Sequence, residues 1–265
     1  MLTNATSKSE RTLILAGRLL VGAGLLVFWE YSPELLGVST FWFSRPSLVY
    51  EKAAELFGSG VLMRHISLTL LETSLGFVLG SAAGLVIGFA LALSTRMTAV
   101  LEPFLLVMNA FPKVAMAPLF MIWFGIGLGM KVAVAFSLVV VVMVLSALSG
   151  MRAVRKDLVD NAKLLGATYS QILFKIVLPS IGPWLFAGFK ISLAFALIGA
   201  VLGEFIAAQG GVGYLVEQGM SNFDSAIVFL GLVILLLISL VINACMDFLG
   251  RRLGYLDQFG RNFQS

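Results

Sequence analysis

Charged residues are scarce in this sequence: 18 Lys and Arg and 14 Asp and Glu make up only 12% of its 265 residues. A soluble domain of ordinary composition carries about 25% charged residues, because its surface faces water. The apolar fraction is 59% and the mean hydropathy is +1.00. These values exclude an ordinary cytosolic enzyme and a disordered chain, and they indicate an integral membrane protein. At about 20 residues per spanning helix, the length allows roughly six or seven spans.

Groups that support catalysis or cofactor binding are also lacking. Cys245 is the only cysteine, so no internal disulfide can form and a secreted disulfide scaffold is excluded. The sequence has no Gly-x-x-x-x-Gly-Lys phosphate loop, and its His, Cys and carboxylate residues are not spaced as metal ligands. We interpret the one histidine, His65, as structural. We therefore expect no enzymatic activity, no cofactor, no metal site and no nucleic-acid partner.

Unbroken apolar runs, such as residues 132–148, predict helices that cross the membrane. Strands of a membrane β-barrel would alternate apolar and polar residues, and in lipid a helix satisfies its backbone groups internally. The prediction is therefore an all-α polytopic membrane protein with one transmembrane domain over residues 1–265. Six spans are expected, at about 13–29, 66–93, 99–123, 131–149, 183–206 and 226–249. The first is interpreted as an uncleaved anchor, and Pro112 and Pro118 should break or kink the third.

The distribution of Lys and Arg predicts the orientation, because cytoplasmic loops carry the excess of positive charge. With six spans, one side of the membrane collects eleven of these residues: Lys8, Arg11, Arg96, Arg152, Arg155, Lys156, Lys163, Lys175, Arg251, Arg252 and Arg261. The opposite side has four, which are Arg45, Lys52, Arg64 and Lys131. Both termini and the segment 151–182 are therefore predicted to lie in the cytoplasm.

Two segments on the other side have local patterns. The stretch SRPSLVYEKAAELF predicts an amphipathic helix along the membrane face, capped by Ser44 or Ser47 and with Pro46 in its first turn. The segment 207–225 contains four glycines and no Lys or Arg. It is interpreted either as a tight turn followed by a short helix that dips toward the pore, or as an ordinary loop.

The segment 151–182 is too long for a simple turn and too polar to span the membrane. Its sequence predicts two short helices, Asp157–Leu165 and Tyr169–Val177. Gly166 should end the first, since glycine suits the left-handed turn that follows many helices. Pro179 should end the second. Such an insert between two spans predicts a docking surface.

The spacing Asp160-Asn161-Ala162, three residues, Gly166, nine residues, Ile176-x-Leu178-Pro179 resembles the EAA loop of the permeases of binding-protein-dependent ABC importers. Asp160 stands where that family usually has glutamate, and Asn161 where it has its first alanine. Four further stretches resemble the nitrate, sulfonate and taurine branch of the family, so the resemblance covers about residues 40–250. They read RPSLVYEKAAELF, LGFVLGSAAGLVIGFALAL, NAFPKVAMAPLFMIWFGIGLGMKV and GGVGYLVEQ.

The resemblance implies a type I importer fold in a bacterial inner membrane. A second copy of the chain would complete the translocation pathway in the bilayer, two copies of a cytoplasmic ABC ATPase would bind the ATP, and an external, periplasmic binding protein would deliver the substrate. It also implies a small solute, such as a nitrate-, sulfonate- or taurine-like anion or a related small organic compound. The residues implied in coupling to the ATPase are Asp160, Asn161, Ala162, Leu165, Gly166, Ala167, Leu178 and Pro179.

Two sets of residues inside the spans predict contacts. Gly76, Gly80, Gly84 and Gly88 recur every four residues on one helix face and predict close helix packing, within one subunit or across the dimer. Charges inside a span are unfavourable and need a reason. Four of them are candidates either for the pathway or for internal pairing: Glu72, Lys113, Lys190 and Glu204. A stand-alone secondary transporter or membrane scaffold, with a purely structural cytoplasmic loop, is the alternative function.

Overall fold

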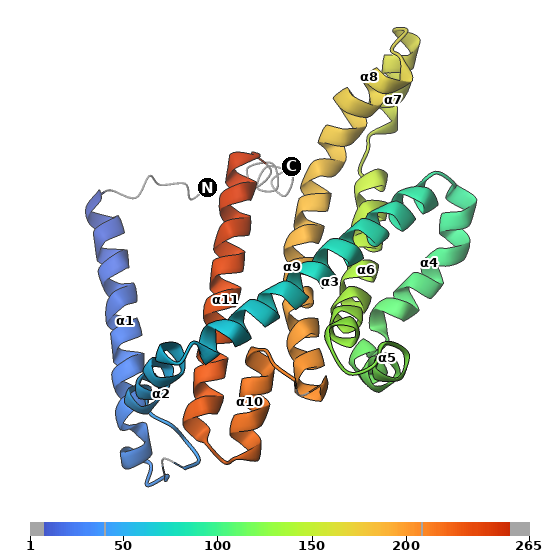
Figure 1. Cartoon of the computed structure of the whole chain (residues 1–265). Coiled ribbons are helices and arrows are strands. Elements are labelled where there is room, and N and C mark those ends of the chain that lie inside the picture. The colour runs from blue at the N-terminus through green and yellow to red at the C-terminus, as the bar shows by residue number, and fades with distance from the viewer. Residues whose placement is uncertain (1–7, 40, 208, 255–265) are drawn as a thin grey trace. The chain divides into compact units, whose positions relative to one another are not determined.

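The computed structural model describes residues 8–39, 41–207 and 209–254, with side chains from Thr12 onward. Every regular element in these ranges is a helix, which confirms the all-α prediction (Figure 1). Arg261 and the side chains of Lys8 and Arg11, which the orientation prediction uses, lie outside the described residues. The described chain divides into two compact units. One combines the residues up to Met63 with Leu215–Val233, and the other combines Arg64–Tyr214 with the chain from Ile234 onward.

Five of the described helices are long and apolar enough to cross a membrane. They are Thr12–Leu35 within α1 (Lys8–Leu35), α3 (Val61–Ala92), α6 (Leu128–Arg152), Tyr169–Ala207, and α11 (Ser225–Arg252). The sixth predicted span is a broken pair, α4 (Thr95–Ala110) followed by Lys113–Phe124, bent by 81°. Pro112 lies at the bend, while Pro118 is tolerated in the first turn of α5 (Ala117–Phe124). The predicted effect of the prolines is confirmed for Pro112.

The first unit packs α1 against α2 (Pro46–Gly58), the predicted amphipathic helix. The indole nitrogen of Trp29 donates to the backbone carbonyl of Ser44 at 2.9 Å, and its ring contacts Phe229. Pro46 begins α2 as predicted, but the predicted serine caps are wrong, because neither hydroxyl caps the helix and Arg45 is the N-cap residue. The carboxylate of Glu30 accepts the first-turn N–H of Ser47 instead. A negative charge is favourable at this end of a helix.

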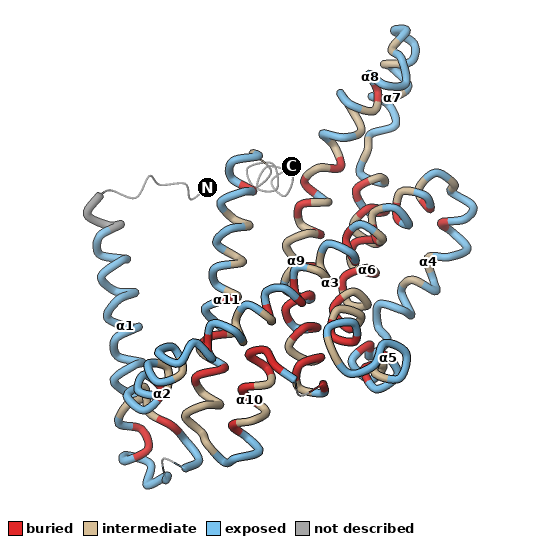
Figure 2. Tube along the Cα trace, in the orientation of Figure 1, coloured by how far each residue is buried: buried red, intermediate tan, exposed pale blue. Residues whose placement is uncertain are grey.

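The core of the second unit is the contact between α6 and α9 (Leu178–Ala207) (Figures 1 and 2). Val139, Met143 and Ala196 are buried there. A Cβ built on Gly199 would lie 2.5 Å from the Cα of Ala135, so this position has room only for glycine. The two helices therefore approach to backbone contact, which is how helices gain van der Waals energy in lipid.

The glycine stripe of α3 lies against α6 of the same chain. A Cβ built on Gly80 would meet Val139 at 2.7 Å, and one on Gly84 would meet Met143 at 2.5 Å. The outer two glycines of the stripe, Gly76 and Gly88, face Ala135 and Ala147 in the same way. All four glycines thus lie against α6 of the same chain, with no room for a side chain between the two helices. In Figure 1, α3 runs obliquely across α6 and α9.

The second predicted helix of the segment 151–182 does not end at Pro179, and that prediction is wrong. The helical chain runs on from α8 (Tyr169–Ile172) through η2 (Leu173–Val177) into α9. The turn η2 is a π-helix, in which the N–H of Leu178 reaches back to the carbonyl of Leu173. This wider turn accommodates Pro179, which has no N–H to donate and would clash with the carbonyl of a regular α-turn.

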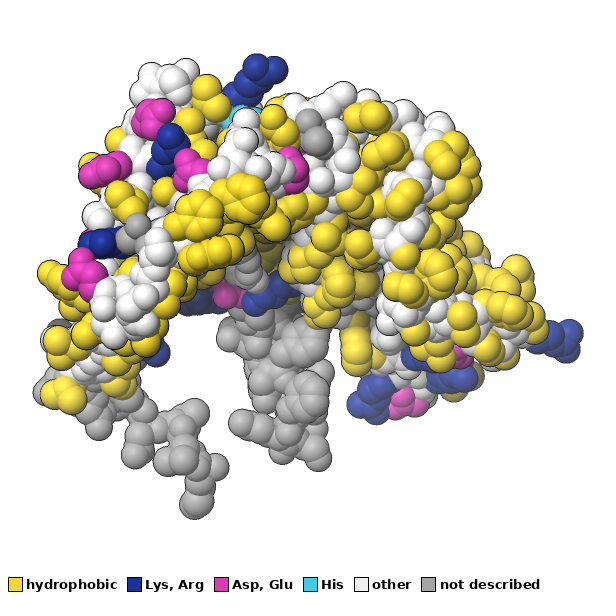
Figure 3. Space-filling view, turned by 90° about the horizontal axis from the view of Figure 1, so that it is seen from below, with side chains coloured by type: hydrophobic (Ala, Val, Ile, Leu, Met, Phe, Trp, Pro, Cys, Tyr) yellow, Lys and Arg dark blue, Asp and Glu magenta, His cyan; other side chains and the backbone are white. Residues whose placement is uncertain are grey.

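Large apolar side chains are exposed along the spans, above all on α1, where every residue from Thr12 to Phe28 is exposed. Hydrophobic side chains cover most of the face seen in Figure 3, while charged side chains gather in separate groups. A helix with an apolar outer surface and no unsatisfied backbone groups is what the hydrocarbon layer requires. The chain is therefore built as a multi-pass membrane protein.

We predict that Gly84→Leu destabilises the second unit, because its side chain has no space beside Met143 and the backbone carbonyl of Val140. Overpacking of this kind typically costs about 1–3 kcal/mol. Gly24→Leu is the matched control, since a Cβ at Gly24 meets nothing within 4 Å. Thermal unfolding of the purified protein, followed by size-exclusion chromatography, checks this. Equal melting temperatures for the two variants would contradict the packing role of the stripe.

Candidate functional site

The predicted docking segment contains an isolated short helix, α7 (Lys156–Leu164), which lies beyond the ends of α6 and α9 (Figure 1). Asp157 in its first turn and Lys163 in its last turn both complement the helix dipole. Arg155 donates two hydrogen bonds to Asp157 and holds the pKa of that carboxyl below its ordinary value. The sequence therefore specifies both ends of α7 locally.

Gly166 ends α7 as predicted. Its φ is +81°, a left-handed conformation that favours glycine. The N–H of Ala167 donates to the carbonyl of Ala162 and that of Gly166 to the carbonyl of Lys163, each at 2.9 Å. This pair of bonds is a Schellman motif, which satisfies the free carbonyls of the helix. The chain then reverses, and Thr168 and Gln171 form a capping box that starts α8.

The turn presents apolar side chains outward. Leu164 is 86% exposed and Leu165 is 87% exposed, and Tyr169 beside them is also exposed. Two adjacent leucines with so much free surface are unfavourable in water, and exposed apolar groups of this kind mark an interaction surface. Asp160 and Asn161 are exposed on α7 as well, with Asp160 3.6 Å from Lys163. Leu178 and Pro179 are exposed at the start of α9.

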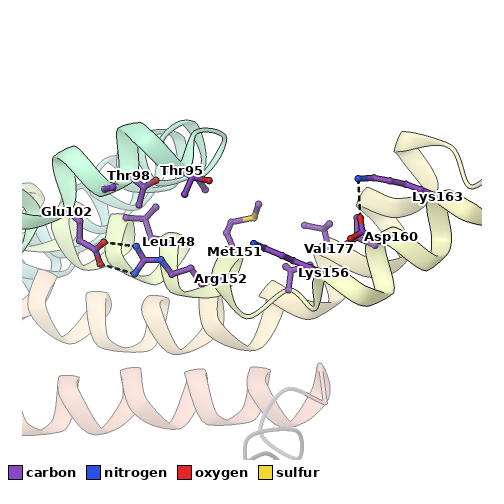
Figure 4. A pocket seen from close by; sticks show the side chains of 14 residues that line it. Thr95, Thr98, Glu102, Leu148, Met151, Arg152, Lys156, Asp160, Lys163 and Val177 are labelled. Carbon is purple, nitrogen blue, oxygen red and sulfur yellow. Dashed lines mark hydrogen bonds and ion pairs between the residues drawn. The ribbon is translucent and has the colours of Figure 1, made fainter.

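A groove of about 690 Å³ runs between α4, the end of α6, and α7 (Figure 4). Thr95 and Thr98 line it from α4, and Lys156 and Asp160 from α7. Arg152, the last residue of α6, donates two parallel hydrogen bonds of 2.8 and 2.7 Å to Glu102 of α4. A bidentate pair between Arg and a carboxylate fixes the relative orientation of the two side chains in addition to stabilising their charges. The pair therefore joins α4 to the end of α6, from which the chain continues into α7.

A second group of polar residues lies inside the spans and is called here the polar cluster: the partly buried His65 and the buried Thr69 and Glu72 of α3, Lys131 of α6 and Glu204 of α9. Its central ion pair joins Lys131 Nζ to Glu72 Oε1 at 2.9 Å, with side chains only 4% and 2% exposed. A buried pair of this kind holds its helices in one arrangement, because separating the partners leaves an uncompensated charge.

The polar cluster holds the loop that leads into α10 (Val212–Ser221). Each of the four residues from 210 to 213 has one backbone group that is hydrogen-bonded to a side chain of the polar cluster. Lys131 donates to the carbonyl of residue 210 at 2.8 Å, and the N–H groups of residues 211, 212 and 213 donate to His65 Nδ1, Thr69 Oγ1 and Glu204 Oε2 at 3.0, 2.8 and 2.7 Å. Backbone groups near a helix start need such partners. The loop is therefore fixed to three spans.

Glycine is required where this loop meets Glu204. A Cβ built on Gly211 would collide with the Glu204 carboxylate, and Gly211 has a φ of +109°. A Cβ on Gly213 would lie 2.8 Å from Glu204 Oε2. The predicted turn and short helix are confirmed, and the structure adds the reason for the glycines.

The other two predicted charges lie elsewhere. Lys190 of α9 binds Asp247 of α11, with Nζ and Oδ1 2.5 Å apart and both side chains about one-third exposed. Lys113 is buried, and its Nζ donates to the backbone carbonyl of Asn109 at 3.3 Å. In a regular helix the backbone N–H of Lys113 would donate to the carbonyl of Asn109. Because the chain breaks at Pro112, this N–H donates to the carbonyl of Phe111 instead, and the Asn109 carbonyl accepts from the Lys113 side chain. Each of the four charges thus has an internal contact.

Sequence reasoning missed Lys131 and Thr69, and it did not give the contacts of His65. Lys131 lies at the start of a span, where a lysine ordinarily reaches the interface, and its burial depends on Gly203. A Cβ on Gly203 would lie 2.8 Å from the Lys131 Cα. One signal was present in the sequence. Acidic residues inside the spans and a lysine at the end of a span suggest an ion pair, but the sequence does not show which acidic residue is the partner. His65 is structural, as predicted, since its ring accepts from the loop and stacks on Tyr214.

Comparison with known proteins gives three findings. Residues 76–255 match the model of the family described as "Binding-protein-dependent transport system inner membrane component". The riboflavin transport system permease protein RibX of Chloroflexus aurantiacus is 34% identical over 229 residues, covering 86% of this chain and 85% of the relative. The taurine transport system permease protein TauC of Escherichia coli is 27% identical over 236 residues, covering 87% and 86%.

The fold is also similar to a solved structure. A chain of the MetNI methionine ABC transporter in an inward facing conformation matches with a TM-score of 0.65 at 20% sequence identity. The match covers 73% of this chain and 96% of that chain. At this identity the likeness concerns the fold alone.

We predict that His65→Leu destabilises the loop, because the N–H of Gly211 loses its acceptor. A buried donor left without a partner costs about 1–3 kcal/mol. His65→Asn is the matched control, since its amide oxygen can take the place of Nδ1. Thermal unfolding and amide hydrogen exchange at residues 209–214 check this. Equal exchange in both variants would show that the His65 contact does not hold the loop.

Proposed function

The chain belongs to the family of binding-protein-dependent transport system inner membrane components, the permeases of type I ABC importers, and we propose that it forms the translocation pathway of an ATP-driven importer for a small solute. Its role is transport rather than catalysis, and a separate ATPase subunit binds and hydrolyses the ATP. Family membership favours this function over a stand-alone secondary transporter or scaffold.

The surface formed by Leu164, Leu165 and Tyr169, called here the α7 surface, is proposed to dock on the ATPase. The observation that carries this proposal is the fixed turn at Gly166, which holds two leucines 86% and 87% exposed at the end of α7. The predicted coupling residues Asp160, Asn161, Ala162 and Ala167 surround this turn, while Leu178 and Pro179 lie at the start of α9. A docked partner would bury the two leucines, and the fixed turn would set the position of that partner relative to the spans.

The proposed mechanism is a change between two arrangements of the spans. ATP binding would close the paired ATPase subunits and move the α7 surfaces of two permease copies. Such rigid-body switching converts binding energy at one site into a conformational change at another. The Arg152–Glu102 pair supports this route, because it joins the end of α6, which leads into α7, to the broken span.

The proposed orientation places α7 and both termini in the cytoplasm and the loop 209–213 on the outer side, where an external binding protein would deliver the substrate. It rests on the excess of Lys and Arg on one side of the spans. For the substrate we propose a small organic solute or anion of the sulfonate and taurine type. The relatives' names include both riboflavin and taurine, so family membership alone supports only this broad class.

Lys190 and Lys113 are proposed to border the pathway. Lys190 is the more accessible, since its side chain is 36% exposed even when paired with Asp247. A cation there would favour an anionic or strongly polar substrate inside the low-dielectric interior. Glu72 and Glu204 are proposed to support the loop instead, because both are buried in the polar cluster.

To test coupling, we predict that the double variant Leu164→Ser, Leu165→Ser inserts normally but loses its ATPase. The serines leave the Schellman turn intact and remove the apolar contact. Lys163→Ala is the control, because its exposed pair with Asp160 contributes little. Co-purification of the ATPase and substrate-stimulated ATP hydrolysis are measured in both. Full ATPase recovery and hydrolysis in the double variant would contradict docking at this surface.

To test the pathway, Lys190→Met is compared with Asp247→Asn and with the double variant. If Lys190 serves the substrate, Lys190→Met should assemble but transport poorly, Asp247→Asn should transport better than Lys190→Met, and the double variant should not recover. If the pair only joins α9 to α11, the single variants should be equally impaired in assembly and the double variant should recover. Transport assays in proteoliposomes, with assembly measured in parallel, separate these results.

A further inference from the structure

Two carboxyl groups in the polar cluster share a single ammonium group. Glu72, Glu204 and Lys131 are 1%, 0% and 3% exposed. The imidazole of His65 is neutral in this arrangement, because its Nδ1 accepts the N–H of Gly211. With both carboxyl groups ionised, the cluster would hold one negative charge without compensation. A buried charge of this kind is strongly unfavourable and is normally removed by neutralisation.

The hydrogen bonds of the two carboxyl groups also show that one donor is missing. Both oxygens of Glu204 have donors, the Thr69 hydroxyl at 2.6 Å and the Gly213 N–H at 2.7 Å. Glu72 Oε1 accepts from Lys131, but Glu72 Oε2 is buried and has no donor among the residues that the structure describes. The side chains of Glu72 and Glu204 also interact with each other inside the cluster. Two carboxylates cannot bond to each other, because each only accepts.

We propose that Glu72 and Glu204 bind one proton between them, so that the polar cluster contains one ammonium, one carboxylate and one neutral carboxyl group. The proton comes from water and no other bond is made or broken. It supplies the missing donor and removes the uncompensated charge in a single step. The other charged or titratable groups near the site are Arg64 on α3 and Tyr214 on α10, and both lie on the His65 side.

The proton gives the cluster a function that the ion pair alone lacks. Lys131 joins α6 to α3, and the shared proton joins α3 to α9, so the three spans that hold the loop are bonded to one another. Glu204 in turn positions residue 213. The bound proton is therefore a structural ligand of the loop that leads into α10.

The test is infrared spectroscopy of the assembled complex in lipid nanodiscs at neutral pH. A neutral carboxylic acid has a carbonyl stretch separate from the amide and carboxylate bands, and it shifts on exchange into D₂O. We expect the spectrum of Glu72→Gln to lack one such band that the unaltered complex shows. Glu102→Gln is the matched control, because Glu102 is ionised beside Arg152 and its loss should leave the band unchanged. An identical carbonyl region in Glu72→Gln and the unaltered complex would overturn the proposal.

A functional comparison supplies a second outcome. Glu72→Gln keeps an oxygen for Lys131 and offers an amide N–H toward Glu204, in place of the shared proton. We therefore expect it to assemble and transport at the unaltered rate, whereas Glu72→Ala, which removes the partner of Lys131, should lose most of the assembled complex. Loss of assembly in Glu72→Gln equal to that in Glu72→Ala would show that an ionised Glu72 is required, which also overturns the proposal.

Discussion

The constraint on which the rest of the structure depends is that lipid offers no hydrogen bonds to a polar group. At several interruptions of the helices that the structure describes, a side chain therefore bonds to the backbone. At the bend beside Pro112, the ammonium of Lys113 bonds the carbonyl of Asn109. At the π-turn before Pro179, the hydroxyl of Ser180 donates to the carbonyl of Ile176. The loop before α10 is the largest case, with polar side chains from three spans.

Close helix packing makes these polar contacts possible. The side chains of the polar cluster reach one another only because α3, α6 and α9 approach to backbone contact at glycines. Gly199 and Gly203 bring α9 onto α6, and the stripe that includes Gly80 and Gly84 brings α3 onto the same helix. A Cβ at any of these positions would lie within 2.8 Å of an atom of α6, so the helices would have to move apart. The glycines thus allow the three helices to approach one another, and the buried charged groups then hold the helices in one relative position.

Much of the fold followed from the sequence because its causes are local. Apolar runs predicted the spans, Pro112 the break, and Gly166 the end of α7. Pro179 misled, because whether a proline ends a helix depends on whether the preceding turn can widen, and a local pattern does not reveal this. The pairing of Lys131 with Glu72 and of Lys190 with Asp247 joins residues 59 and 57 positions apart, so it depends on the tertiary packing. The sequence identified the charges but not their partners.

The continuous helix Tyr169–Ala207 connects the polar cluster of the second unit with the segment that leads from α7. Its 39 residues extend for about 58 Å at 1.5 Å per residue. At one end Glu204 belongs to the polar cluster, and at the other the chain turns into α7 with its exposed leucines. Because the polar cluster bonds α9 to α3 and α6, a displacement of α7 cannot be absorbed by sliding α9 past these helices. It must be taken up at the π-turn η2 or at the bend between α4 and α5, where regular helical bonding is already interrupted. These two interruptions are therefore where we expect a type I importer permease of this sequence to bend.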